Sequence, residues 1–356
     1  MDTLDIPLLE RIDEIDARWL EAALGGRVAG FTTRPIGAGN VSDTVLVTVD
    51  WAERPDGAPA AVVAKFRPSV PEVHAHGVGS GAYHREIGAY RAITERAACR
   101  IPHLHHVDGD ETNINLVIED LTGAEAGNQV AGCDIPHAEA VLRQFARLHA
   151  TFFPVDLATA PAWPIRMTEV AGYWSEKARA GAVEVRKRFA DRLSATDLDL
   201  VDGMAEVVHA WHLLPQERLT LTHGDPRVDN ILFESVGGRL GAVLIDWQVT
   251  GLRNPMYDVG YFLSGSVGID DRRAHEQAPL EHYVREFEAV APGYALADAI
   301  EDYRTQVLSG LVITTAATAI LPDVEPVNTL LLALLERNCA AAADWDSVAV
   351  TRERSA

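Results

Sequence analysis

The sequence predicts an α+β fold in two parts: a small N-terminal lobe over residues 1–120 and a larger, mostly helical C-terminal lobe over residues 121–356. Three observations support this prediction. Runs of β-branched residues separated by turn residues fill the first part, whereas helical periodicity dominates the second. The early strands follow one another after short connections, which favours antiparallel neighbours. The length of 356 residues also suits about two domains of ~150 residues each.

The five strands predicted for the N-terminal lobe form an antiparallel sheet and span residues 31–36, 45–49, 61–66, 103–107 and 115–118. An amphipathic helix is predicted before the sheet, over residues 5–24, because its apolar residues recur near helical spacing. After the third strand, residues 69–81 predict a loop that contains glycine and histidine, and residues 82–97 predict a helix. The predicted lobe boundary lies near residue 121, where strand patterns give way to long helical patterns.

Long helical patterns fill the C-terminal lobe, and they predict helices over residues 137–152, 167–191, 196–213, 280–290 and 296–345. Two short apolar runs interrupt these patterns and predict strands over residues 231–233 and 242–245. The sequence contains neither an internal repeat nor a low-complexity segment.

The composition is that of a globular protein, with 47% hydrophobic and 23% charged residues. It excludes a disordered chain, a coiled coil and a collagen-like fibre. The 52 acidic residues outnumber the 31 basic ones and give a net charge of −21. Such acidity argues against a nucleic-acid partner, because binding to phosphates requires clustered Lys and Arg.

Cysteine usage and the lack of long apolar stretches indicate a soluble, cytoplasmic protein with no membrane partner. Cys99, Cys133 and Cys339 are too far apart in the sequence for a CxxC metal pair, and we expect small buried thiols in a reducing compartment. The acidic N-terminus has no basic segment followed by an apolar run, so it is not a secretion signal. The least polar stretch, residues 310–322, is shorter than the ~20 apolar residues that span a bilayer.

The most informative motif is His223-Gly224-Asp225, followed by Asn230 and, at the end of an apolar strand, Asp246. Phosphoryl transfer to a hydroxyl requires a carboxylate that orients the acceptor and oxygen ligands for Mg²⁺. Asp225 can supply this catalytic carboxylate, and Asn230 and Asp246 can supply the metal ligands. The alternative is a structural turn whose Asp and Asn only satisfy backbone groups, but the spacing of 21 residues between the two aspartates argues against it.

These residues resemble the aminoglycoside phosphotransferase and choline kinase family, which has a bilobal protein-kinase-like fold. The motif HGDxxxxN, residues 223–230, is similar to the kinase catalytic loop HRDxxxxN, and Ile245-Asp246-Trp247-Gln248 is similar to the segment that opens with the metal aspartate. Within the group, both sequence segments look most similar to a branch that includes insect ecdysteroid kinase-like proteins. The resemblance runs from about residue 37 to residue 258. It implies Mg²⁺ as cofactor, ATP or GTP as phosphate donor, and a small-molecule alcohol as acceptor.

Arg227 stands two residues after Asp225, where protein kinases place a lysine that steadies the transferred phosphate. A guanidinium suits that role because it contacts phosphate in a bidentate manner. The alternatives are a surface arginine or one paired with Asp229. Asp258 resembles a family aspartate that braces the catalytic loop, and His149 is predicted as a packed helix residue.

The predicted nucleotide site begins with a glycine turn between the first two strands, in which Gly37, Gly39 and Ser42 bring backbone and hydroxyl groups to phosphate. The turn lacks the full GxGxxG pattern. Lys65 lies on the third strand and resembles the kinase lysine that binds phosphates, and Glu86 opens the next helix, where the family places its partner.

The segment with Glu119 and Leu121 resembles the hinge, whose backbone would bind the base. Two patterns elsewhere are weaker. The glycines of residues 77–81 do not fit a dinucleotide fingerprint. The histidines between residues 74 and 106 have no metal-binding spacing, so we expect solvated or hydrogen-bonded side chains.

Together these residues predict a Mg²⁺-dependent O-phosphotransferase that uses ATP or GTP. The acceptor stays open: an antibiotic such as an aminoglycoside or a nucleoside, which would make the protein a resistance factor, or another metabolite alcohol. Three alternatives remain: a protein kinase, a non-catalytic nucleotide-binding scaffold of the same fold, and a metal-dependent hydrolase. The lack of an APE-type segment after Asp246 argues against the protein kinase, and the complete residue set argues against the scaffold. A hydrolase would not need Lys65 or the glycine turn.

Overall fold

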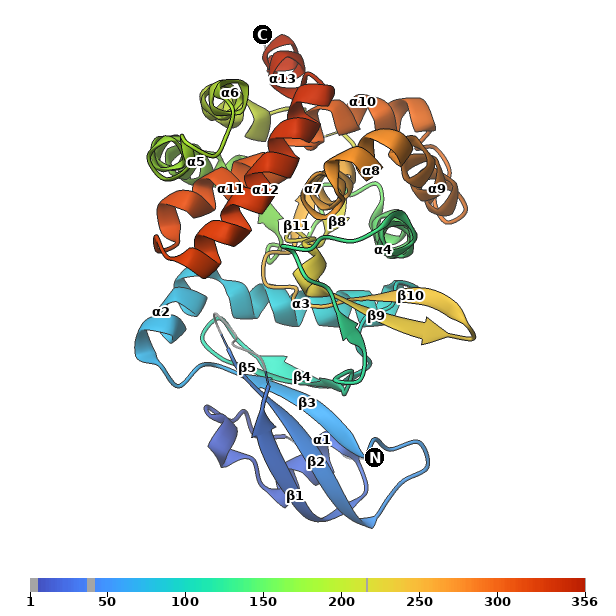
Figure 1. Cartoon of the computed structure of the whole chain (residues 1–356). Coiled ribbons are helices and arrows are strands. Elements are labelled where there is room, and N and C mark those ends of the chain that lie inside the picture. The colour runs from blue at the N-terminus through green and yellow to red at the C-terminus, as the bar shows by residue number, and fades with distance from the viewer. Residues whose placement is uncertain (1–5, 37–41, 216, 356) are drawn as a thin grey trace. The chain divides into compact units, whose positions relative to one another are not determined.

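The computed structural model describes residues 6–36, 42–215 and 217–355, and these form two compact units (Figure 1). The sheet unit comprises Met1–Ala97, Ile101–Ala124 and Asp246–Val249. The helical unit comprises Ala98–Arg100, Glu125–Ile245 and Thr250–Ala356. The chain therefore passes between the units several times, and Asp246 belongs to the sheet unit although the strand before it belongs to the helical unit.

The sheet unit contains a five-stranded antiparallel sheet in the order β1-β2-β3-β5-β4, which confirms the predicted α+β fold class. Its strands are β1 (Arg27–Pro35), β2 (Asp43–Glu53), β3 (Ala61–Phe66), β4 (Leu104–Gly109) and β5 (Ile114–Glu119). Side chains alternate between the two faces of a strand. Val62, Ala64 and Phe66 of β3 therefore share one face, where they join a buried cluster with Trp19. Lys65 is left for the opposite face.

The helices of this unit are η1 (Ile12–Glu14), α1 (Ala17–Leu24), α2 (Pro71–Ser80) and α3 (Ala82–Arg96). Helix α1 packs against β1 and β4, and α3 packs against β4 and β5. The predicted helix over residues 5–24 is wrong in extent, because the α-helix starts only after Asp16, whose side chain accepts from the Trp19 amide at 2.8 Å.

The predicted loop over residues 69–81 is also wrong, since most of it forms α2. Its glycines argued against a helix, but Gly77 meets a packing need. A Cβ atom at Gly77 would lie 2.4 Å from the Tyr83 hydroxyl.

Helices make up most of the helical unit: α4 (Ile135–Phe152), α5 (Met167–Phe189), α6 (Ala195–His212), α7 (Met256–Ser266), α8 (Ile269–His275), α9 (Gln277–Glu288), α10 (Leu296–Gln306), α11 (Leu308–Ile320), α12 (Glu325–Asp344) and α13 (Ser347–Ser355). The helix predicted over residues 296–345 is wrong, because three helices occupy it. The chain turns near Val307 and again at the Leu321-Pro322 step, where proline cannot continue a helix.

Two small sheets carry the loops of interest. One has the order β10-β9-β6, with β6 (Glu125–Ala126), β9 (Ile231–Val236) and β10 (Arg239–Leu244). The other has the order β7-β11-β8, with β7 (Ile165–Arg166), β8 (Thr220–Thr222) and β11 (Gly251–Arg253). The β9–β10 pair is antiparallel and matches the two predicted strands in place.

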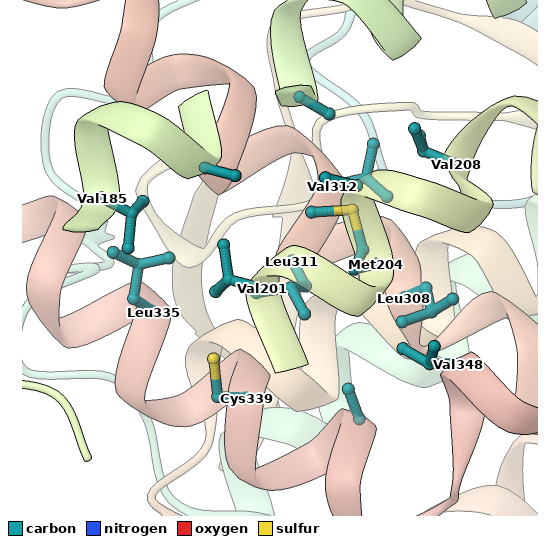
Figure 2. Packing of buried hydrophobic residues seen from close by; sticks show 14 of the residues in the cluster. Val185, Val201, Met204, Val208, Leu308, Leu311, Val312, Leu335, Cys339 and Val348 are labelled. Carbon is teal, nitrogen blue, oxygen red and sulfur yellow. The ribbon is translucent and has the colours of Figure 1, made fainter. Parts of the chain in front are cut away.

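Helices α5, α6, α11 and α12 supply much of a hydrophobic cluster in the helical unit (Figure 2). Val185, Val201, Leu311 and Leu335 represent these four helices in the cluster, and all of them are buried. Among the described residues, no helix is both long and apolar enough to cross a membrane.

Candidate active site

The loop that carries Asp225 begins where β8 ends, and Asp258 of α7 holds its first two amides. The carboxylate of Asp258 accepts from the His223 amide at 2.6 Å and from the Gly224 amide at 3.0 Å. Gly224 has a φ of 89°, a conformation that favours glycine. The His223 ring donates from Nε2 to the Ile245 carbonyl at 2.8 Å, which ties the loop to the end of the β9–β10 pair. The predicted bracing role of Asp258 requires contacts of this kind.

Asp225 is held by two side chains of its own loop. Arg227 forms a fork on the carboxylate, with Nε 2.9 Å from Oδ1 and Nη2 3.1 Å from Oδ2. Asn230 donates from Nδ2 to the Asp225 carbonyl at 2.9 Å and to Oδ2 at 3.0 Å. Arg227 also lies 3.7 Å from Asp229. The arginine is thus paired with both neighbouring aspartates, and its bidentate contact is with Asp225.

The charges around Asp225 keep it ionised. Burial by itself would raise the pKa of Asp225, but the Arg227 guanidinium, His223 and the Asn230 amide lower it overall. The Asp225 carboxylate in turn raises the pKa of Arg227. At neutral pH the site therefore offers an anionic oxygen that can accept a hydrogen bond from a hydroxyl group.

In the sheet unit, Lys65, Glu86 and Asp246 come together. Lys65 Nζ lies 2.7 Å from Glu86 Oε1 and 3.5 Å from Asp246 Oδ1, and the Glu86 side chain is only 2% exposed. Burial lowers the pKa of Lys65, but the carboxylates of Glu86 and Asp246 outweigh it and raise that pKa. Lys65 is therefore an ammonium group, on the sheet face where alternation along β3 places it.

Asp246 has a left-handed backbone with a φ of 68°, a conformation that Asp and Asn tolerate better than most residues. Its Oδ1 is buried and has no hydrogen-bond partner among the described residues. Two residues later, the Gln248 carbonyl accepts from Arg85 Nε at 2.6 Å, which attaches this segment to α3. The sheet unit thus holds Asp246 in an unusual conformation with an oxygen left for a further ligand.

Asn230 and Asp246 offer the oxygen donors that Mg²⁺ prefers. The two Nδ2 bonds of Asn230 leave its side-chain carbonyl as an acceptor. The buried Oδ1 of Asp246, which lies 3.5 Å from Lys65 Nζ but accepts no hydrogen bond from the described residues, is another such oxygen. Mg²⁺ is usually held by one or two side chains together with phosphates and waters. Each of the two side chains, taken in its own unit, therefore offers an oxygen that suits this ion. Within residues 6–36, 42–215 and 217–355, no group of three or more His, Cys, Asp or Glu is arranged to hold a metal.

The other predicted nucleotide residues occupy separate places. Gly37 and Gly39 lie outside the described residues. Ser42 is buried just before β2, and its hydroxyl has no partner in the described part of the chain. Glu119 ends β5, where its amide donates to the His103 carbonyl at 2.9 Å and its carboxylate accepts from the His103 amide at 2.9 Å. Leu121 follows, and its carbonyl accepts from the Ala124 amide at 2.9 Å.

Sequence reasoning missed Gln129, a buried residue that supports the loop that carries Asp225. Its Oε1 accepts from the Val228 amide at 2.8 Å, and its backbone amide donates to Asp229 at 2.7 Å. These bonds secure η2 (Val228–Asn230), which carries Asn230. A single glutamine about 100 positions from its partners leaves no periodic or spacing signal, so only the fold reveals it.

The helical unit also contains a cavity of about 260 Å³, whose lining includes Trp211, Arg218, Asn254 and Asp302. In the β8–β11 register, Thr222 faces Gly251 and Thr220 faces Arg253. Arg218 precedes Thr220 and Asn254 follows Arg253, so the cavity lies at the end of β8 away from His223. It is therefore separate from the loop that carries Asp225.

Several solved structures are similar to this one. A microcompartment-associated aminopropanol kinase is 16% identical, with 93% of this chain and 98% of that chain covered and a TM-score of 0.54. A choline kinase from Cryptosporidium parvum Iowa II is 11% identical, with 96% and 93% covered and a TM-score of 0.54. The GDP and kanamycin complex of APH(2″)-IIia is 15% identical, with 96% and 95% covered and a TM-score of 0.50. At these identities the likeness establishes the fold alone.

A curated relative, acyl-CoA dehydrogenase family member 10 from Mus musculus, is 46% identical over 50 residues. This match covers 14% of the present chain and only 5% of the mouse protein. The model of the ecdysteroid kinase-like family matches residues 41–291, a stretch that includes Lys65, Glu86, Asp225, Asn230 and Asp246. Because that match extends over more than half of the sequence, the chain belongs to the ecdysteroid kinase-like family.

Proposed function

We propose that this protein is a Mg²⁺- and nucleotide-dependent O-phosphotransferase that phosphorylates a hydroxyl of a small molecule. The observation that carries the proposal is the buried Lys65–Glu86 pair, at 2.7 Å, with Asp246 at 3.5 Å from the same ammonium. A largely buried cation flanked by two carboxylates suits a phosphate chain and its metal ion. Family membership and the kinase-like fold support the same activity.

In this proposal the sheet unit binds the nucleotide. Lys65 contacts the α- and β-phosphates and Glu86 orients it. Asp246 and Asn230 hold Mg²⁺, which would neutralise charge on the phosphates. Ser42 and the glycine turn, with Gly37 and Gly39, would contribute donors to the phosphates. The Glu119 amide already donates to His103, so the base would bind to later backbone groups of the hinge, such as the Leu121 amide.

The helical unit supplies the groups that act on the acceptor. Asp225 orients the acceptor hydroxyl and would take its proton as the oxygen bonds to the terminal phosphorus and the bond from that phosphorus to the departing nucleoside diphosphate breaks. Arg227 holds the carboxylate ionised through its fork, and its guanidinium would also stabilise the transferring phosphoryl group. Because the pKa of Asp225 is lowered, its carboxylate is a weak base. Asp225 therefore contributes more by orienting the acceptor hydroxyl through a hydrogen bond than by removing the proton early in the reaction.

The acceptor is a small alcohol, and the charge of the protein favours a cationic one. With a net charge of −21, the surface attracts amines such as aminosugars. A similar structure contains kanamycin and GDP, and others are an aminopropanol kinase and a choline kinase. An amino alcohol or an aminoglycoside antibiotic is therefore the first acceptor class to test, with nucleosides and neutral metabolite alcohols next. ATP and GTP are both candidate donors.

The test is calorimetric binding of Mg-ATP and Mg-GTP to the wild type and to Asp246→Asn. Asparagine tolerates the left-handed backbone at this position, so the variant removes charge without adding strain. We expect binding to require Mg²⁺ and to weaken at least about tenfold in the variant, or ~1.4 kcal/mol. Asp56→Asn, in an exposed turn of the same unit, is the control and should bind like the wild type.

Either outcome is informative. Mg²⁺-dependent binding identifies the donor, and release of ADP or GDP on addition of amino alcohols or aminoglycosides then identifies the acceptor class. If neither nucleotide binds at millimolar concentration, the phosphotransferase proposal is refuted and the hydrolase alternative becomes the next to test.

A further inference from the structure

We propose that Tyr283 is a positioning residue for the catalytic loop, acting through His149 and Asp258. Tyr283 lies on α9, His149 on α4 and Asp258 on α7, so three separate helices contribute. All three side chains are fully buried in the helical unit. The inference rests on the proposed function, since it concerns the loop that carries Asp225.

The three side chains form an unbroken hydrogen-bonded series that ends on the loop backbone. The Tyr283 hydroxyl lies 2.8 Å from His149 Nδ1. His149 Nε2 lies 3.0 Å from Asp258 Oδ2. That same oxygen accepts from the His223 amide at 2.6 Å, while Oδ1 accepts from the Gly224 amide at 3.0 Å. Asp225 is the next residue of the chain.

The direction of each hydrogen bond follows from which atoms can carry a hydrogen. The Asp258 carboxylate already accepts from two amides, and a carboxylate only accepts, so His149 Nε2 carries the hydrogen that points to it. A neutral imidazole then has only a lone pair at Nδ1, and the Tyr283 hydroxyl donates to that lone pair. Tyr283 thereby selects the tautomer in which His149 donates to Asp258.

The selected tautomer matters because Asp258 is fully buried and bulk solvent does not reach it to replace a lost donor. Burial by itself would raise the pKa of Asp258, and hydrogen bonds from His149 and the loop amides lower it instead. If His149 adopted the other tautomer, a lone pair would face the buried carboxylate. The carboxylate would then shift, and the amides of His223 and Gly224 would shift with it.

The chain provides a matched control in Tyr294, which belongs to the same aromatic cluster. The rings of Tyr283 and Tyr294 lie 5.9 Å and 5.1 Å from the ring of Phe287. Tyr294 is also buried, and its hydroxyl donates to Asp302 at 3.0 Å. Asp302 keeps its two bonds from Arg218 when that hydroxyl is removed. Loss of either hydroxyl therefore removes one buried hydrogen bond, but only Tyr283 leads to the catalytic loop.

The experiment compares Tyr283→Phe with Tyr294→Phe in the full-length protein. Turnover is followed as Mg-nucleotide hydrolysis without acceptor, and ¹⁵N-histidine labelling reports both the His149 ring and the His223 amide. His149→Gln identifies the ring signals. For Tyr283→Phe we expect kcat to fall roughly ten- to a hundredfold with little change in the nucleotide KM. We also expect loss of the single Nε2–H tautomer and a shifted His223 amide. Tyr294→Phe should keep the wild-type kcat and histidine spectrum.

The inference is overturned if Tyr283→Phe retains wild-type kcat, or if Tyr294→Phe loses kcat to the same extent. It is also overturned if the His149 tautomer is unchanged. The spectra separate this failure from failure of the proposed function. If the wild type hydrolyses no nucleotide, the phosphotransferase proposal loses support, whereas a shifted His223 amide in Tyr283→Phe alone still supports the positioning role.

Discussion

Asp225 combines a low pKa with a fixed orientation, because Arg227 holds both of its oxygens and Asn230 holds one of them. Arg227 in turn depends on the geometry of η2, which places Asp229 near the same guanidinium. One short segment therefore fixes both the negative charge of the Asp225 carboxylate and its orientation. A substitution that removes only the charge should leave this segment folded.

Asp225→Asn keeps the shape of the side chain but removes the negative charge that, in the proposed function, accepts the hydroxyl proton. We expect kcat to fall by about 10³-fold, within the range for loss of a general base, with nucleotide affinity nearly unchanged. Steady-state kinetics and calorimetry would measure the two effects. Asp199→Asn removes another aspartate that pairs with an arginine, on the exposed face of α6, and should change neither. Full turnover in Asp225→Asn would contradict the assignment.

The sequence could indicate which residues surround this chemistry, but not which of them pair. The spacing of Asp225, Asn230 and Asp246 is a linear property, so it is visible without a structure, as is Lys65 at the end of an apolar strand. Their proposed roles stay predictions. The bidentate contact of Arg227 with Asp225 depends on a side-chain rotamer, and the bonds of Gln129 and Tyr283 depend on segments that are distant in the sequence.

His212 gives the fold a calculable pH dependence. Burial, opposed by a bond to the Val208 carbonyl, lowers its pKa to about 4. Between pH 4 and the pKa of ~6.5 that histidine has in the unfolded chain, His212 is therefore protonated in the unfolded chain but not in the folded one. We expect stability to fall as the pH drops through this window, by up to ~3 kcal/mol, and to level off above it.

Urea unfolding of the wild type and of His212→Gln at pH 7.5 and pH 5 would measure this loss. The variant should lose less stability than the wild type between the two pH values. His275→Gln, at an exposed histidine, should lose as much as the wild type. Equal losses in all three proteins would show that His212 does not titrate in this way.

At the scale of elements, the contact between α5 and α11 depends on the absence of a side chain. A Cβ atom at Gly181 would lie 1.9 Å from the Thr315 carbonyl oxygen. Gly172 lies on the same helix, where a Cβ atom would meet nothing within 4 Å. One glycine is thus required for helix packing and the other is not.

Gly181→Ala should therefore force the two helices apart and lower the free energy of unfolding by about 1–3 kcal/mol, despite the better helix propensity of alanine. Gly172→Ala should raise it by about 0.5–1 kcal/mol, because nothing opposes that propensity. Chemical denaturation of both variants measures the difference. Opposite signs are the expected result, and a stabilised Gly181→Ala would contradict this packing.

The elements that sequence patterns predicted well are those with a strong local signal. The third strand, residues 61–66, matches β3, and residues 137–152 fall within α4. Helix α2 was missed because its glycines have low helix propensity, although packing against Tyr83 requires one of them. Pro322 indicates a helix end, but the apolar periodicity on both sides of it predicts one continuous helix.

At the scale of the whole molecule, the family and the fold class were accessible from the sequence because each rests on order along the chain. The strands, the lysine, the glutamate and the HGDxxxxN motif occur in the sequence in a characteristic succession, and the family match over residues 41–291 covers all of them except the first strand. The acceptor was not accessible. No short motif in the sequence specifies which alcohol would bind.

The assignment of Asp246–Val249 to the sheet unit has a consequence for how this protein can be divided or recombined. A fragment that stopped at Ala124 would lack the aspartate opposite Lys65 and the Gln248 carbonyl to which Arg85 donates. The segment that completes the sheet unit is synthesised more than a hundred residues after its last strand. Neither unit is therefore encoded by one continuous stretch of sequence. Gene fusion or domain shuffling could exchange one unit only by cutting the chain in several places.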